Sequence, residues 1–133
     1  MPITCIFFDV GGTLGDVDKH THAFSVFADT RPLLESLRAP GRRFGVISNV
    51  PDSMKSADLV ALLAKAGIGD LFENALVIAS TDAPKQKPDA AIFAFAAKRA
   101  DVDIADCMFV GEDVGEVIGA RLAGMNAQLK PRT

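Results

Sequence analysis

Polar residues of four types, most of them directly after short apolar runs, together suit the transfer of a phosphoryl group. They are Asp9 after the run 5–8, Ser48 after 44–47, Lys87 in a polar stretch, and Glu112 with Asp113 after 107–111. A carboxylate can attack phosphorus and form an acyl-phosphate. A hydroxyl and an ammonium group can hold the phosphoryl oxygens and balance their charge. Further carboxylates can bind Mg²⁺, which prefers oxygen ligands.

The apolar runs that carry these residues are short and lack polar alternation, as is typical of strands buried on both faces. We predict strands at 5–8, 44–47, 75–79, 107–110 and 126–130, and helices at 32–38, 59–66, 88–96 and 118–123. We expect residues 15–30 to form a loop or small flap and residues 80–87 to form a polar loop. This alternation predicts an α/β fold, a doubly wound (Rossmann-like) three-layer sandwich with a five-stranded, mainly parallel sheet. The carboxyl ends of parallel strands share one edge, so the polar residues can converge there.

Composition narrows the class of protein. The 133 residues are enough for a single domain spanning 1–133. A net charge of −3 gives no basic footprint, so we expect no nucleic acid partner. No apolar run approaches the ~20 residues of a membrane span, and no signal-like segment opens the chain, so we expect a cytoplasmic protein without a membrane partner. We predict that Cys5 and Cys107 are buried free thiols.

The motifs themselves resemble those of one known family. The stretches are Phe8-Asp9-Val10-Gly11-Gly12-Thr13-Leu14, Val46-Ile47-Ser48-Asn49, Lys87-Pro88-Asp89 and Phe109-Val110-Gly111-Glu112-Asp113. In order and approximate spacing they are similar to the four motifs of the haloacid dehalogenase-like hydrolase superfamily, and the resemblance covers nearly the whole chain. It implies the same α/β fold that the apolar runs predict.

The resemblance also implies roles for individual residues. Asp9 would be the nucleophile, Ser48 would bind the phosphate, and Lys87 would neutralise its charge. Gly12 and Asn49 would join Ser48 and Lys87 in contacting the substrate. A Mg²⁺ ion would be held by Asp9, the backbone carbonyl of Gly11, Glu112 and Asp113. The implied activity is that of a Mg²⁺-dependent phosphatase with an aspartyl-phosphate intermediate on Asp9.

Three departures from the family pattern bear on that activity. Family phosphatases usually carry a second aspartate, the general acid and base, where this chain has Gly11. The metal-binding acids begin with Glu112 where the common pattern has aspartate, which leaves open whether Glu112, Asp113 or Glu116 binds the metal. The segments at which family members insert a cap domain are here only residues 15–30 and 80–86, so we expect a capless core with an open site.

These departures leave several alternatives. The open site suits a phosphorylated small molecule or macromolecule, a lid from another copy in a homo-oligomer, or a protein partner. Gly11 is compatible with a catalytically weak or inactive protein that binds phosphate, metal or a protein, and less favourably with a dehalogenase, whose halide leaving group needs no proton. A group in the predicted flap could replace the missing acid and base, and the candidates are Asp16, Asp18, His20 and His22.

Overall fold

A five-stranded parallel sheet forms the centre of the molecule. In the computed structural model, which describes residues 2–131, the strand order is β5-β4-β1-β6-β7. The strands are β1 (Cys5–Phe8), β4 (Arg43–Ser48), β5 (Val77–Ala79), β6 (Cys107–Gly111) and β7 (Asn126–Leu129). Each neighbouring pair is parallel. The predicted doubly wound α/β fold is confirmed.

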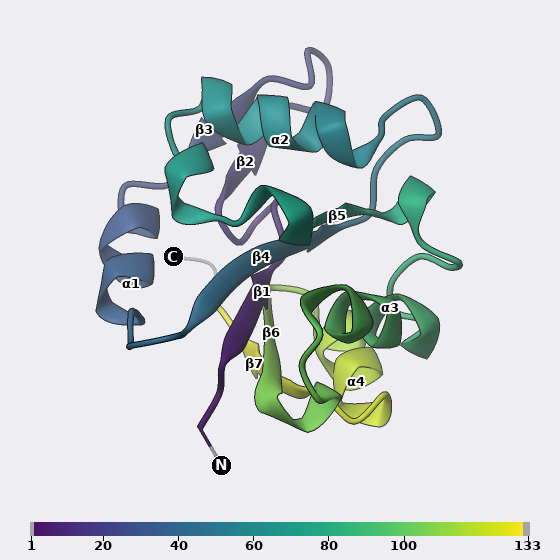
Figure 1. The fold of residues 1–133 in the computed structure, drawn as a ribbon. Helices are drawn as coiled ribbons and strands as arrows, with labels where there is room; N and C mark the ends of the chain where they lie inside the picture. Colours follow the sequence, from purple (N-terminus) through teal and green to yellow (C-terminus); the bar gives the residue numbers. More distant parts are fainter. Residues whose placement is uncertain (1, 132–133) are drawn as a thin grey trace.

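Helices cover both faces of the sheet (Figure 1). They are α1 (Thr30–Ser36), α2 (Ser56–Lys65), α3 (Ala90–Ala100) and α4 (Val114–Leu122). Because side chains alternate along a strand, β1 serves both layers. Cys5 and Phe7 pack in the cluster that contains α3 and α4 residues, whereas Ile6 and Phe8 pack in the cluster that contains α1 and α2 residues. Two apolar cores on either side of the sheet therefore hold Asp9 at the end of its central strand.

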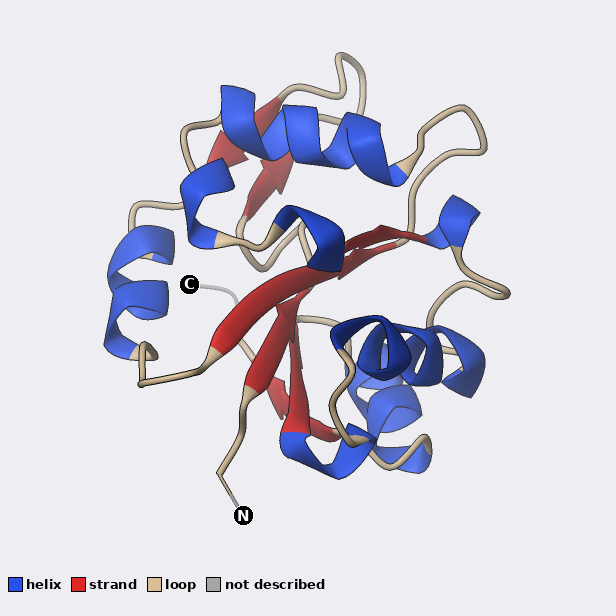
Figure 2. Cartoon of the chain, viewed as in Figure 1, coloured by secondary structure: helices blue, strands red, loops and turns tan. Residues whose placement is uncertain are grey.

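The segment between β1 and α1 is more ordered than the loop that we predicted (Figure 2). Strands β2 (Gly15–Val17) and β3 (Phe24–Val26) pair in antiparallel fashion and form a small hairpin. Gly15 is required there, because a Cβ at this position would overlap the backbone carbonyl of Ser25. The predicted flap is thus a β-hairpin, and the described residues between β1 and β4 form no separate cap domain.

The remaining differences from the predicted elements are local. Residues 74–76 form a 3₁₀ turn (Asn74–Leu76), so β5 begins at Val77. Further 3₁₀ turns are Gly69–Leu71, Ser80–Asp82 and Ile104–Asp106. Helix α3 begins at Ala90 instead of Pro88, because Asp89 caps it by accepting a hydrogen bond from Ala91 N. Cys5 and Cys107 face each other on β1 and β6 as buried free thiols, as expected.

None of the helices within residues 2–131 combines the length and the apolarity that crossing a membrane requires.

Candidate active site

Asp9 lies directly after β1, at the carboxyl edge of the sheet, and contacts a buried lysine. Lys87 Nζ donates a hydrogen bond to Asp9 Oδ1 at 2.7 Å and lies 2.7 Å from Glu116 Oε1. The Lys87 side chain has no exposed surface, whereas those of Asp9 and Glu116 are 12% and 19% exposed. The cation is therefore covered by protein, and the two carboxylates that neutralise it retain access to solvent.

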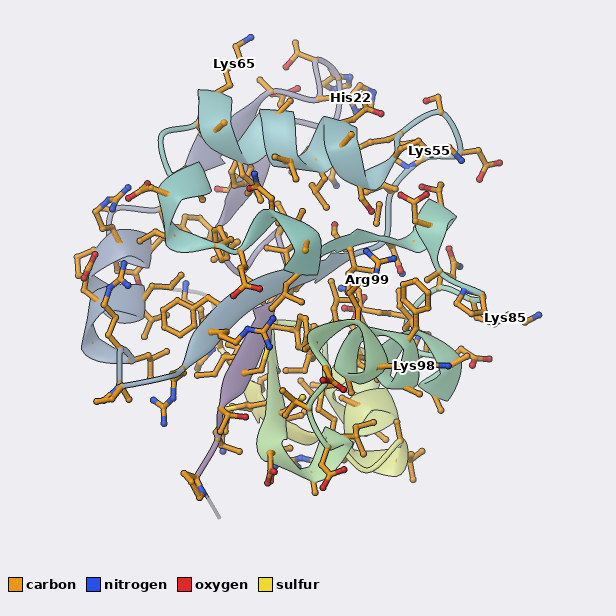
Figure 3. The ribbon with its side chains drawn as sticks, viewed as in Figure 1. His22, Lys55, Lys65, Lys85, Lys98 and Arg99 are labelled. Carbon is orange, nitrogen blue, oxygen red and sulfur yellow. The ribbon has the colours of Figure 1, made fainter. Side chains whose placement is uncertain are left out.

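The buried lysine is fixed by its backbone as well as by its ammonium group. Asn49, which follows β4, accepts a hydrogen bond from Lys87 N at 2.9 Å and donates one from Nδ2 to Lys87 O at 3.0 Å. The ammonium group also lies 5.0 Å from the centre of the Phe109 ring, a favourable cation–π distance. Lys85, the nearest alternative in sequence, is exposed and points away from the molecule (Figure 3). The structure thus brings Lys87, and not Lys85, to Asp9.

Ser48 and Asn49 complete the polar floor of the site. Ser48 ends β4, the neighbour of β1 in the sheet, and Ser48 and Asp9 line one cavity of about 700 Å³. The only hydrogen bond from Ser48 Oγ within residues 2–131 is a long one of 3.4 Å, to the carbonyl of Asn49. Its hydroxyl therefore keeps capacity for a ligand, while the two strong bonds of Asn49 make that side chain a support for Lys87.

Glu112, Asp113 and Glu116 line the cavity beside Asp9. Asp113 caps α4, where its Oδ1 accepts a hydrogen bond from Glu116 N at 3.0 Å. Glu112 lies against Gly12, where a Cβ would come within 2.7 Å of Glu112 Cγ. Gly12 has φ +80° and is not among the residues that line the cavity. The positive φ is a backbone conformation that favours glycine, which explains why this position has no side chain.

Glu116, one of the three acids that the sequence leaves open as metal ligands, is the acid that reaches Lys87. Burial raises the pKa of its carboxyl group, and this effect outweighs the attraction of Lys87, which acts in the opposite direction. Glu116 Oε1 is buried and makes an ion pair with Lys87 but no hydrogen bond. Glu116 lies in the first turn of α4, which Asp113 caps directly after β6, and this position places it near the strand ends.

The oxygen donors suit a hard cation. Asp9 Oδ1 is engaged by Lys87, but its other oxygen has no hydrogen bond within residues 2–131, and Glu116 Oε1 has none either. Among those residues no three His, Cys, Asp or Glu side chains gather into a ready metal cluster. Mg²⁺ does not need such a cluster, because it is commonly held by one or two carboxylates together with waters and substrate phosphate. The donor chemistry therefore fits Mg²⁺.

The hairpin residues that could replace the missing acid and base differ in position. His22 lines the cavity at the hairpin turn, with φ 59°, whereas Asp16, Asp18 and His20 are not among the lining residues. Asp18 Oδ1 accepts hydrogen bonds from His20 N and Thr21 N, and the backbone hydrogen bonds hold the pKa of this carboxyl group below its usual value. Asp18 thus shapes the turn as a carboxylate. His22, labelled on the hairpin loop in Figure 3, is the one of these four candidates that lines the cavity.

Gly11, where family phosphatases carry the second aspartate, also lines the cavity. Its backbone does not have a positive φ, and a Cβ placed on it would have Val17 Cγ2, at 3.8 Å, as its nearest neighbour. Neither backbone strain nor crowding therefore requires glycine here. The absence of a carboxyl group is a chemical difference that the fold does not impose.

A family model for haloacid dehalogenase-like hydrolases matches residues 20–124, which is most of the chain. The chain belongs to the haloacid dehalogenase-like hydrolase family. Its match to a hydrolase family agrees with the arrangement of Asp9, Ser48 and Lys87 on one cavity.

Named relatives of this hydrolase include phosphatases. The chain is 32% identical over 107 residues to phosphatase MT3486 of Mycobacterium tuberculosis, covering 80% of this chain and 47% of that protein. It is 30% identical over 119 residues to a plasmid-encoded phosphoglycolate phosphatase of Cupriavidus necator, covering 90% and 45%. A solved phosphatase of the same superfamily from Thermococcus onnurineus superposes with a TM-score of 0.69 at 30% identity, covering 83% and 48%. The chain spans about half the length of each.

Proposed function

We propose that this hydrolase is a Mg²⁺-dependent phosphomonoesterase that works through an aspartyl-phosphate on Asp9. One observation carries the proposal: the Asp9 carboxylate opens into a cavity while a buried ammonium group lies 2.7 Å from it. The hydrogen bond from Lys87 holds this carboxylate in place for attack on phosphorus, and the ammonium group can balance the charge of the phosphoryl oxygens. The similarity to phosphatases supports a phosphate ester as substrate.

The reaction would have two steps. An Asp9 oxygen attacks phosphorus in line with the ester oxygen, so that a new P–O bond forms as the bond to the alcohol breaks. A water molecule then attacks phosphorus, the P–O bond to Asp9 breaks and restores the carboxylate, and the proton of the water leaves with the inorganic phosphate or passes to solvent. Ser48 Oγ and Lys87 Nζ would donate hydrogen bonds to the phosphoryl oxygens in both steps. Because Gly11 offers no acid, the proton for the leaving alkoxide would come from water or from His22 at the rim of the cavity.

Mg²⁺ would be held by Asp9 and the carbonyl of Gly11 together with acids from the start of α4. Asp113 uses Oδ1 to cap α4 and Glu116 Oε1 is paired with Lys87, so Glu112 and the second oxygen of Asp113 are freer to bind it. When bound, the ion would neutralise phosphate charge and orient the phosphoryl group.

The test is phosphate release by wild type and Asp9→Asn in the presence of Mg²⁺ or EDTA. We expect Asp9→Asn to lose activity by about 10⁴-fold or more, since removal of a nucleophile commonly has effects of this order. Asp103→Asn, an exposed aspartate outside the cavity, is the matched control and should keep full activity. Turnover that persists in folded Asp9→Asn would refute the nucleophile assignment.

A second candidate function is binding without turnover. The observation that favours it is Gly11, because the cavity contains Asp9, Ser48 and Lys87 but has no acid at the position that family phosphatases use. In that case the wild type would bind a phosphate analogue such as beryllofluoride with Mg²⁺, and phosphate release would stay at the level of the Asp9→Asn variant.

A further inference from the structure

The cavity above Asp9 is larger than a phosphoryl group requires. Its volume of about 700 Å³ lies within the range of sites for drug-sized ligands. The polar floor is formed by strand ends, and the walls come from the β2–β3 hairpin, the loop at 49–54 and helix α2. In this hydrolase a phosphate on Asp9 would therefore leave room for a substantial leaving group between the hairpin and α2.

The walls of that space are apolar. The apolar lining residues come from every wall and are Val10, Val17, Val50, Pro51, Met54, Leu59 and Leu62. Val17 keeps 43% of its surface exposed although it lies on a strand of the hairpin. Exposed apolar surface that rims a polar site is typical of a surface that a ligand covers. The apolar part of a substrate would gain by covering these side chains.

The charged residues that line the cavity also disfavour a charged leaving group. Among the described residues that line it, only Lys87 and His22 can carry a positive charge, and Lys87 is already paired with Asp9 and Glu116. Four carboxylates line the same space. A second negative group on the substrate, such as the carboxylate of phosphoglycolate, would find no free lysine or arginine among these lining residues to pair with it.

We propose that the leaving group of the ester cleaved at this site is uncharged and apolar, an alkyl chain or an aromatic ring lying between the hairpin and α2. This inference rests on the proposed phosphatase function. It separates this chain from the activity in the names of its phosphoglycolate phosphatase relatives.

The experiment compares three esters of primary alcohols: phenylpropyl phosphate, ethyl phosphate and phosphoglycolate. All three release an alkoxide, so differences in kcat/KM report chiefly on contacts with the rest of the leaving group. We expect wild-type protein with Mg²⁺ to favour phenylpropyl phosphate over each of the others by about 10-fold or more. A preference for phosphoglycolate, or equal rates on all three, would overturn the inference and leave the phosphatase function standing.

Variants at Leu62 test whether the wall formed by α2 is responsible for the preference for phenylpropyl phosphate. Leu62 lies on α2, lines the cavity and is partly exposed, so Leu62→Gln and Leu62→Lys are expected to fold. Leu62→Gln should lower the preference for phenylpropyl phosphate about 10-fold, and Leu62→Lys should in addition raise kcat/KM for phosphoglycolate. Leu122→Gln and Leu122→Lys change an 81% exposed leucine on α4 outside the cavity and serve as matched controls. Equal effects of the two sets of variants would contradict the inference.

A binding measurement keeps the inference testable if the wild type hydrolyses none of the esters, a result that would contradict the proposed function. Calorimetry would then compare phenylpropylphosphonate with phosphonoacetate, which replace the ester by a stable P–C bond. Tighter binding of phenylpropylphosphonate, lost in Leu62→Lys and kept in Leu122→Lys, supports an apolar ligand. Tighter binding of phosphonoacetate overturns it.

Discussion

Lys87 and Arg43 lie at opposite edges of one sheet, and each is a cation next to carboxylates. Arg43, the first residue of β4, donates two hydrogen bonds to Glu73 at 2.9 and 2.7 Å and a third to the carbonyl of Ala100. Lys87 at the carboxyl edge is buried, and its partners Asp9 and Glu116 still open into a cavity. At the amino edge the polar groups satisfy one another on the surface, whereas at the carboxyl edge they keep bonding capacity for a ligand.

The difference follows from how the two edges are covered. At the amino edge the chain enters the strands, and Arg42 and Arg43 bond backbone carbonyls there, among them those of Ile3 and Leu37. At the carboxyl edge the hairpin, the loop at 49–54 and α2 surround the cavity into which Asp9 and Ser48 open. A buried cation needs carboxylates around it, and at this edge the carboxylates that surround Lys87 also line the cavity.

Replacement of Lys87 should have the largest effect. Lys87→Met leaves Asp9 and Glu116 facing each other without a cation, so we expect activity to fall about 10²–10³-fold. The free energy of unfolding at pH 7 should fall by about 3 kcal/mol, because breaking a buried ion pair leaves uncompensated charge. Lys85→Met, at the exposed lysine two residues earlier, should change neither quantity. Denaturant unfolding and phosphate release measure both effects.

The pH dependence of this loss has a definite sign. Burial already raises the pKa of Glu116, and removal of Lys87 removes the attraction that lowers it. A raised carboxyl pKa makes the folded state less stable at high pH than at low pH. The difference in stability between wild type and Lys87→Met should therefore be greatest at neutral pH and shrink as the pH falls through the range in which Glu116 gains its proton. A difference that grows on acidification would contradict this electrostatic account.

Gly11→Asp should have the next largest effect, and in the opposite direction. The position has space for a side chain and no positive φ, so the variant should fold with nearly unchanged stability. A carboxyl group beside Asp9 would supply the missing proton transfer and raise the rate of phosphate release by about 10²-fold. Gly11→Asn, equal in size but unable to transfer a proton in this way, is the matched control. An unchanged rate in folded Gly11→Asp would mean that the missing acid does not limit this site.

The sequence predicted the strands and the residues at their ends, but not the contacts between distant segments. The apolar run at 5–8 predicted β1, and the shared edge of parallel strands predicted that Asp9 and Ser48 would lie together, because burial on both faces leaves a strong local pattern. The bonds between Asn49 and Lys87 join residues 38 positions apart, and no local pattern encodes them. The hairpin was missed because its strands have three residues each and include Asp16 and Ser25. The motif acids were predicted as a group, but only packing shows that Glu116 reaches Lys87.

Gly119→Ala tests whether α4 helps to position Lys87. A Cβ on Gly119 would overlap the carbonyl oxygen of Pro88 and lie 2.9 Å from its Cβ, so the residue next to Lys87 would have to move. We expect a loss of about 1–3 kcal/mol in the free energy of unfolding from overpacking, together with reduced activity. Leu122→Ala, on the exposed face of the same helix, should leave both almost unchanged. Normal stability and activity in Gly119→Ala would show that this contact is not required.

Arg43→Met should have the smallest effect and marks the contrast with Lys87. The Arg43 and Glu73 side chains are 35% and 45% exposed, so solvent screens the pair and its loss should lower the free energy of unfolding by about 1 kcal/mol or less.

Hydrogen bonds from Arg43 hold the pKa of Glu73 below its usual value of 4.5. That contribution is present above pH 4.5 and is lost as the pH falls through the lowered pKa of Glu73. The stability difference between wild type and Arg43→Met should thus shrink on acidification, as measured by urea unfolding at several pH values. Phosphate release should be unchanged, because Arg43 lies at the edge of the sheet opposite Asp9; a loss of activity as large as that of Lys87→Met would abolish the distinction between the two edges.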